Sequence, residues 1–415
     1  MQVDVPYGKE NIKINISEPF EILVPKQLTL KDEDKLIEEA LENTFGFESF
    51  DEFSENCNKL LVIINDATRP TPTSKILKYL LPFLSSHPDL KFLIATGVHR
   101  APTEEEYRFI FGDTYEIFRR RAYPHDARKD EDMVYLGKSK NGTEMYINKL
   151  VPEYKNIIVI GSVEPHYFAG YTGGRKSFLP GVASYKTIEM NHKLALSDDA
   201  KSLSLKGNPV NEDMVDAMNV LKDLNVFSIQ TVLTGDHNLY AVTAGELHES
   251  FDAAINFSKE VFCVPLKTKG NIVLTVAPFP MDIDLYQSQK ALDNGKLALE
   301  KNGIIILISK CRMGVGEDAF IELLSRAKSC QEVFEFLGGE YKLGYHKAAK
   351  MAQIGLKAQM WAITDLDDTT IKKSKMKPYK SIQKALDDAI TIVRQQGKKP
   401  RIIVMPLGSL TIPLV

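Results

Sequence analysis

Short apolar runs recur along the chain, and polar or glycine-containing turns separate them. Because a half-exposed strand alternates apolar and polar residues, near-continuous β-branched runs are typical of strands buried on both faces. Segments with a helical pattern lie between the runs, at 71–86, 102–112 and 384–397. This alternation predicts an α/β fold with mainly parallel sheets. The predicted strands cover 59–66, 91–97, 155–162, 271–278, 302–309, 360–365 and 401–408.

The length and the pattern together predict two α/β domains. A chain of 415 residues exceeds what one core usually supports. Residues 264–270 interrupt the pattern, so we expect an N-terminal domain over 1–266 and a C-terminal domain over 267–399. Residues 400–415 are a candidate final strand of the first domain. We expect the active site in a cleft between the two domains, a common place for pockets.

Two N-terminal segments have patterns of their own. Residues 1–16 predict a small β-hairpin that turns at Tyr7 and Gly8. Residues 32–43 predict an amphipathic helix with acidic residues at its start, where the helix dipole favours them.

Composition narrows the class of protein and of partner. The net charge of −3, from 52 basic and 55 acidic residues, gives no reason to expect nucleic acid or a membrane surface. No apolar run reaches the ~18 residues of a membrane span, and the N-terminus does not resemble a secretory signal. The four cysteines are far apart, which predicts neither a zinc nor an iron–sulfur site and indicates a reduced, cytoplasmic protein. They are Cys57, Cys263, Cys311 and Cys330.

Polar residues follow the first three predicted strands, at the sheet edge where open α/β folds bind ligands. Asp66 and Arg69 follow the first strand and could hold a hydroxyl and a carboxylate or phosphate, or could be a helix cap and a surface arginine. His99 follows the second strand. Thr103 and Glu106 form a capping-box pattern for the next helix, so capping does not require His99.

The loop "VEPHYFAGYTGGRKSFLPG", residues 163–181, follows the third strand. It carries His166 and a glycine-rich run from Gly170 to Ser177. That run fails the P-loop pattern, because Arg175 stands where the second glycine should be. A phosphate-bearing ligand is still compatible with the glycine amides and a guanidinium. His192, on a predicted helix over 181–196, is a surface histidine or a ligand for a metal such as nickel.

These motifs, taken in order, resemble those of nickel-dependent lactate racemase and its wider family of 2-hydroxyacid racemases and epimerases. The resemblance is carried by "DATRP", "TGVHR", "EPHYFAGYTGGRKSFLPGVASYKTI" and "NH". It runs over most of the chain and is densest from about 60 to 195. The family cofactor is a nickel-pincer nucleotide, pyridinium-3-thioamide-5-thiocarboxylic acid mononucleotide.

The resemblance implies a role for each matching residue. Lys176 would carry the cofactor covalently, and His192 would bind nickel. His99 and His166 would be the two acid/base groups. The segment "LYQSQKAL" also matches a family motif. The remaining implied residues are Asp66, Thr68, Gly173, Gly174 and Arg175 for the nucleotide, and Arg69, Tyr286, Gln287 and Lys290 for the substrate.

This residue set suits racemisation of a small 2-hydroxy acid. Removing the α-proton is difficult because the adjacent carboxylate is already anionic, so removing a hydride avoids a carbanion. Two enantiomers require an acid/base group on each side, a task that histidine performs near neutral pH. The resemblance also implies maturation by cofactor-biosynthesis proteins. Lactate racemases carry a tryptophan where Tyr345 aligns, so the 2-hydroxy acid accepted here could differ from lactate.

Two other functions compete with the racemase. A nucleotide-dependent phosphotransferase would use the Gly170–Ser177 loop, although the broken P-loop pattern counts against it. A non-catalytic protein that binds small acids would keep the fold and the pocket. The presence of both histidines together with Lys176 counts against the binding protein.

Overall fold

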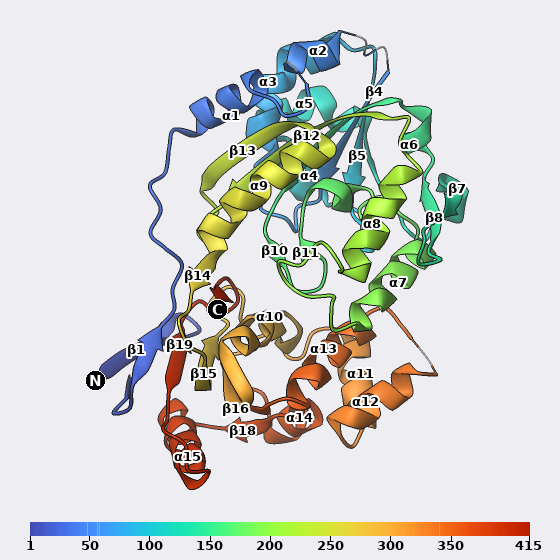
Figure 1. Ribbon diagram of the computed structural model, residues 1–415. Coiled ribbons are helices and arrows are strands. Elements are labelled where there is room, and N and C mark those ends of the chain that lie inside the picture. Colours follow the sequence, from blue (N-terminus) through green and yellow to red (C-terminus); the bar gives the residue numbers. More distant parts are fainter. Residues whose placement is uncertain (48, 56, 58, 340) are drawn as a thin grey trace. The chain divides into compact units, whose positions relative to one another are not determined.

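The computed structural model describes residues 1–47, 49–55, 57, 59–339 and 341–415. It divides into two compact units, Leu28–Val261 and a second that joins Met1–Gln27 to Phe262–Val415. Both units are α/β, as the sequence predicts (Figure 1). In the part of the chain that the structure describes, no helix is long and apolar enough to cross a membrane.

The first unit is built on a six-stranded sheet in the order β13-β12-β9-β4-β5-β6. Its strands run parallel, except that β12 and β13 pair antiparallel. The three strands predicted in this unit are confirmed as β4, β5 and β9. The strand bounds are β4 (Lys59–Asn65), β5 (Asp89–Ala95), β6 (Ala122–Pro124), β9 (Asn156–Ser162), β12 (Asn225–Leu233) and β13 (Leu239–Glu246).

The central strands of this sheet are buried on both faces. On β4, Leu60, Val62 and Ile64 join the core formed with α1, α3 and α4, while Leu61 and Ile63 on the other face are equally buried. Figure 1 shows α9 crossing the sheet at β12 and β13. This two-sided burial explains why the strand sequences are continuous apolar runs. The helix bounds are α1 (Glu33–Glu42), α3 (Thr73–Ser86), α4 (Glu104–Phe111) and α9 (Leu247–Phe262).

The second unit contains a six-stranded, wholly parallel sheet in the order β18-β17-β16-β15-β19-β3. The other four predicted strands are confirmed here as β15, β16, β17 and β19. The main helices are α10 (Leu285–Gly295), α13 (Tyr345–Gly355) and α15 (Ile382–Gln395). The strand bounds are β3 (Phe20–Ile22), β15 (Gly270–Val276), β16 (Leu299–Ile308), β17 (Gln359–Ile363), β18 (Lys377–Tyr379) and β19 (Ile402–Met405).

Both chain termini belong to this second unit. The sequence pattern instead predicts that the first residues belong to the first domain and makes residues 400–415 a candidate part of it. The predicted N-terminal hairpin is present as β1 (Gln2–Tyr7) and β2 (Glu10–Asn15). Its apolar side chains, among them Val5 and Ile14, join the core that β15 and β19 supply. β3 pairs with β19, and β20 (Ile412–Leu414) pairs with β14 (Cys263–Pro265). The N-terminal segment thus joins the six-stranded sheet through β3, and the C-terminal segment forms a separate two-stranded sheet with β14.

Helix α13 buries the side chain of Lys347, which is 4% exposed. Its ammonium donates to the Tyr286 carbonyl at 2.5 Å and lies 3.6 Å from the centre of the Tyr286 ring. Burial, reinforced by the charge of Lys290, lowers the pKa of Lys347 to about 7. A lysine with a lowered pKa costs stability when it is charged, since the unfolded chain holds its proton more tightly.

We therefore expect Lys347→Met to raise the free energy of unfolding at pH 6 by about 1–3 kcal/mol. The gain should shrink as the pH rises above about 7, because the folded wild-type protein then loses the lysine proton. Denaturant unfolding at several pH values measures this difference. Lys372→Met, at an exposed position, is the matched control. A Lys347→Met protein that is less stable than wild type by the same amount at every pH would contradict the prediction.

Candidate active site

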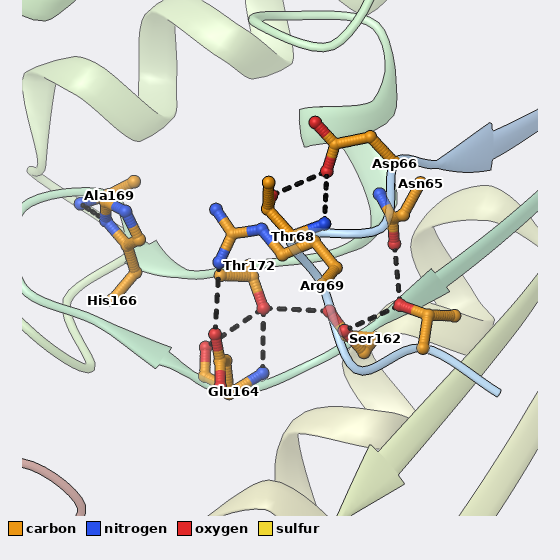
Figure 2. Close-up of polar contacts among 10 residues, drawn as sticks. Asn65, Asp66, Thr68, Arg69, Ser162, Glu164, His166, Ala169 and Thr172 are labelled. Carbon is orange, nitrogen blue, oxygen red and sulfur yellow. Dashed lines mark hydrogen bonds and ion pairs between the residues drawn. The ribbon is translucent and has the colours of Figure 1, made fainter. Parts of the chain in front are cut away.

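The predicted site residues of the first unit follow three strands that are neighbours in the sheet. The order β9-β4-β5 is parallel throughout, so the carboxyl ends of these strands meet at one edge. Asp66 and Arg69 follow β4, His99 follows β5, and His166 follows β9 on the two-residue strand β10 (Pro165–His166). Figure 2 shows the polar contacts that join the loops after β4 and β9.

Asp66 and His99 form a hydrogen-bonded pair between two of these loops. The Nδ1 atom of His99 lies 2.7 Å from Oδ2 of Asp66. Thr68 donates to the other carboxylate oxygen from its amide, at 3.1 Å, and from its hydroxyl, at 2.6 Å. Burial raises the pKa of Asp66, but the hydrogen bonds from His99 and Thr68 outweigh it and leave the pKa below its usual value.

An ionised Asp66 fixes the tautomer of His99. Because the carboxylate can only accept, Nδ1 of His99 must donate, and the lone pair of a neutral ring then lies on Nε2. The His99 side chain is half exposed, whereas the Asp66 side chain is 7% exposed. A buried carboxylate that orients a more exposed imidazole is an arrangement suited to a general base.

His166 has the opposite hydrogen-bonding pattern. It lies in a tight hairpin in which β10 pairs with β11 (Gly170–Tyr171). The amide of Ala169 donates to Nδ1 of His166 at 3.2 Å, a contact drawn in Figure 2. Since Nδ1 accepts, the neutral ring carries its hydrogen on Nε2. The rings of Tyr167 and Phe168 contact the imidazole, with centroids 4.9 Å and 4.6 Å away.

Lys176 and His192 both lie against Phe168. Lys176 is in the 3₁₀ turn η4 (Gly174–Ser177), with its ammonium 5.8 Å from the Phe168 ring centre. His192 is on α7 (Tyr185–Lys193), and its ring centroid is 5.1 Å from that of Phe168. Burial, and then the charge of Lys176, lower the pKa of His192 to about 3. His192 is therefore a neutral imidazole, the form that binds transition metals.

No cluster of three or more metal-ligating side chains occurs among the residues that the structure describes.

Gly173 and Gly174 approach other parts of the protein closely. A Cβ on Gly173 would lie 2.6 Å from the Gln230 amide oxygen and the Val163 side chain, and a Cβ on Gly174 would lie 2.9 Å from the Phe251 ring. Both glycines have a positive φ, of 79° and 52°. The Gly174 amide already donates to Gln230 at 3.0 Å. Packing within the first unit thus accounts for glycine at both positions.

Arg175 is a buried cation with unused donors. It is 2% exposed, donates from Nη2 to the Ala169 carbonyl at 3.1 Å, and lies 4.6 Å from the Phe251 ring centre. Its Nε and Nη1 atoms have no hydrogen-bond partner among the described residues. Burial lowers the pKa of this guanidinium to about 9, although Asp252 opposes the shift. Two unsatisfied donors on a buried cation fit an anionic group such as a phosphate.

The other three predicted substrate residues lie in the second unit, on α10. Asp284 caps this helix by accepting from the Gln287 amide at 2.6 Å. Tyr286 and Lys290 are four residues apart, so both side chains lie on one face of the helix. Gln287 is the residue after Tyr286 and lies on an adjacent face. Burial raises the pKa of Tyr286 to about 12, and the negative charges of Glu317 and Asp284 contribute to this rise. The Tyr286 hydroxyl therefore stays protonated.

Sequence reasoning did not single out several residues that shape the site. Glu164 forms an ion pair with Arg69, with 3.3 Å between Oε1 and Nη1 (Figure 2). Thr172 hydrogen-bonds the Glu164 backbone, and Gln230 holds the Gly174 amide. Glu164 lies two residues before His166 in the sequence. This closeness to a candidate catalytic residue was the only signal in the sequence that could have identified Glu164. Gln230 gave no such signal, because it lies 56 residues from Gly174 along the chain.

Two family descriptions match this chain. Residues 7–204 match the lactate racemase N-terminal domain, and residues 266–412 match the lactate racemase C-terminal domain. The lactate racemase of Thermoanaerobacterium thermosaccharolyticum is 30% identical over 414 residues, which is 95% of this chain and 96% of that protein. The lactate racemase of Lactiplantibacillus plantarum is 29% identical over 421 residues, with 98% of each chain covered.

Solved structures agree with these sequence comparisons. The lactate racemase apoprotein from T. thermosaccharolyticum aligns with a TM-score of 0.90 at 28% identity and covers the whole of both chains. A Thermotoga maritima protein aligns with a TM-score of 0.66 at 16% identity, over 92% of this chain and 98% of that one. At that identity the second match supports the fold alone.

The burial of His192 gives a prediction for histidine titration. We expect the His192 ring to stay neutral from pH 8 down to pH 5, since its pKa is lowered to about 3. NMR of protein labelled at the histidine Cε1 positions measures this, and the spectrum of a His192→Gln variant assigns the peak. A His192 resonance that titrates between pH 6 and 7 would contradict the burial described above.

Proposed function

The chain belongs to the lactate racemase family of isomerases, and from this premise we propose that it interconverts the enantiomers of lactate or of a closely related 2-hydroxycarboxylate. The observation that carries the proposal is the pair of histidines that follow β5 and β9, the two strands on either side of β4, with opposite hydrogen-bonding patterns. In its neutral form, His99 has an unprotonated Nε2, whereas His166 carries its hydrogen on Nε2.

In this proposal the two histidines handle the hydroxyl proton of the substrate. His99 accepts the proton at Nε2, and ionised Asp66 stabilises the imidazolium that forms. His166 donates from Nε2 to the oxygen of the product enantiomer as an imidazolium, and is left neutral with its other hydrogen on Nδ1. In the reverse direction this neutral ring accepts a proton at Nε2 and becomes the imidazolium again. Nδ1 carries a hydrogen in both forms, so the Ala169 amide must release Nδ1 and the 166–169 turn must move before His166 takes part.

We assign carboxylate binding to Arg69, helped by Lys290, Gln287 and Tyr286. A guanidinium can take a carboxylate through two parallel hydrogen bonds, which fixes the acid in one orientation. A lysine ammonium adds charge without imposing a plane. The protonated Tyr286 hydroxyl can donate a hydrogen bond but adds no charge.

The residues around Lys176 suit the family cofactor, a nickel-pincer nucleotide. Bound there, such a group would accept a hydride from C2 of the substrate and return it. Lys176 would attach it covalently, neutral His192 would bind the nickel, and the unused Arg175 donors would take the phosphate. Asp66 and Thr68 are proposed from the sequence as nucleotide contacts, but the Asp66 carboxylate already accepts hydrogen bonds from His99 and Thr68. Arg175 is therefore the stronger candidate anchor.

The phosphotransferase alternative has little support from the geometry of the loop. A phosphate-binding loop needs amides directed at the ligand, but the Gly174 amide is bonded to Gln230. The Lys176 ammonium lies beside Phe168 and close enough to His192 to lower its pKa. We therefore retain the racemase as the single proposed function.

The proposal is tested by making the protein together with the cofactor-biosynthesis enzymes and screening 2-hydroxy acids by chiral chromatography. We expect inversion of lactate or a related acid. Intact mass should show an adduct that is absent from Lys176→Ala, which should also be inactive. Normal folding of that variant is checked by its unfolding curve. An active wild-type protein without nickel or an adduct would contradict the cofactor assignment.

Replacing each histidine separately tests the two-histidine scheme. We expect His99→Ala and His166→Ala each to lower kcat by about 10²–10⁴-fold in both directions, because either loss removes one proton-transfer group. His248→Ala, at an exposed position of the same unit, should retain wild-type rates. A cofactor-loaded His166→Ala protein with wild-type kcat would remove His166 from the scheme.

A further inference from the structure

The ion pair between Arg69 and Glu164 joins the loops that follow β4 and β9. Nη1 of Arg69 lies 3.3 Å from Oε1 of Glu164, and the two side chains are 35% and 34% exposed. At such exposure an ion pair contributes only about 0–1 kcal/mol to stability. Stability is therefore a weak reason for placing a carboxylate beside the arginine that is assigned to the substrate.

The backbone of Glu164 is fixed on both sides by Thr172. The Glu164 amide donates to the Thr172 hydroxyl at 2.9 Å, and the Glu164 carbonyl accepts from the Thr172 amide at 2.8 Å. The same hydroxyl donates to the Ser162 carbonyl at 2.8 Å, at the end of β9. Figure 2 shows the bonds of the Thr172 hydroxyl to Glu164 and Ser162. Because Thr172 is buried, the Glu164 carboxylate projects from a rigid base.

The contact uses only one nitrogen of Arg69. Among the residues that the structure describes, Glu164 is the sole hydrogen-bond partner of the Arg69 guanidinium, and it binds Nη1. The Nε and Nη2 atoms form the opposite edge of the guanidinium. Two parallel N–H groups on one edge are the geometry that binds a carboxylate bidentately.

We propose that Glu164 is a positioning residue that holds the Arg69 guanidinium through Nη1 and leaves the Nε–Nη2 edge to the substrate carboxylate. This inference rests on the proposed function, because it requires a 2-hydroxycarboxylate as the ligand. It also explains why a negative charge lies beside the anion site. An oriented guanidinium loses less conformational freedom when it binds the acid, which offsets some of the repulsion.

The experiment compares KM and kcat for the accepted 2-hydroxy acid in cofactor-loaded variants. We expect Glu164→Ala to raise KM about 10-fold and to change kcat less than about 3-fold, because the histidines are untouched. Glu164→Gln keeps an acceptor oxygen and should stay within about 3-fold of the wild-type KM. Glu116→Ala, which breaks the exposed Arg108 pair on the same unit, should have no effect on either constant.

A second arm tests whether Glu164 acts through Arg69. In an Arg69→Lys background the planar fork is absent, so adding Glu164→Ala should raise KM less than about 2-fold further. If Glu164→Ala does not fold, Glu164→Asp takes its place in the test. Its shorter side chain moves the carboxylate away from Arg69, so KM should rise about 3-fold. Wild-type KM in both Glu164→Ala and Glu164→Asp, or the same effect in both backgrounds, would overturn the inference. Inactive wild-type protein would instead refute the proposed function.

Discussion

The parallel alignment of β4, β5 and β9 is the constraint on which the rest of the site depends. These strands are neighbours, so the segments that leave their carboxyl ends must meet at one edge of the sheet. Asp66 then reaches His99, and Arg69 reaches Glu164, across sequence separations of 33 and 95 residues. A sheet buried on both faces is a rigid support for such contacts. The chemistry lies in the loops, and its geometry is set by the strands.

Two kinds of charge environment lie at this edge. Arg175 is buried and His192 is half-buried, and desolvation lowers the pKa of each. Arg175 keeps two unused donors, and the His192 ring stays neutral. Both environments suit a ligand that brings its own charge and its own metal ligands. Arg69, Glu164 and His99 are partly exposed, as groups that exchange a small substrate must be. The division between buried anchor and accessible chemistry supports the assignment of cofactor and substrate.

Local signals in the sequence were sufficient for most of the fold. All seven predicted strands are present, because continuous β-branched runs have few alternatives to a doubly buried strand. The capping box of Thr103 and Glu106 is confirmed. β12 and β13 were not predicted, since buried polar residues such as Gln230 and Thr243 interrupt their apolar runs. The grouping of the first 27 residues with the second unit depends on long-range pairing of β3 with β19, which no local pattern contains.

The candidate site was predictable only as a list of strand-end residues. Its contacts were not, because they join residues that are distant in the sequence. The sequence indicated neither that Asp66 orients His99 nor that Glu164 holds Arg69. It attributed the glycines at 173 and 174 to a ligand, whereas Gln230, Val163 and Phe251 already require them. The roles of the predicted residues in catalysis rest on the family resemblance, and the geometry adds hydrogen-bonding states and burial to it.

The central claim is that the hydrogen on C2 leaves and returns as a hydride, so that the histidines handle only the hydroxyl proton. The most direct test is to incubate cofactor-loaded protein with one enantiomer of 2-deuterated lactate, or of the accepted acid, in ordinary water. Chiral chromatography with mass detection then follows both configuration and label. The account predicts inversion with deuterium retained in the opposite enantiomer. Inversion with loss of deuterium to the solvent would show that a base removes the α-proton, and would contradict it.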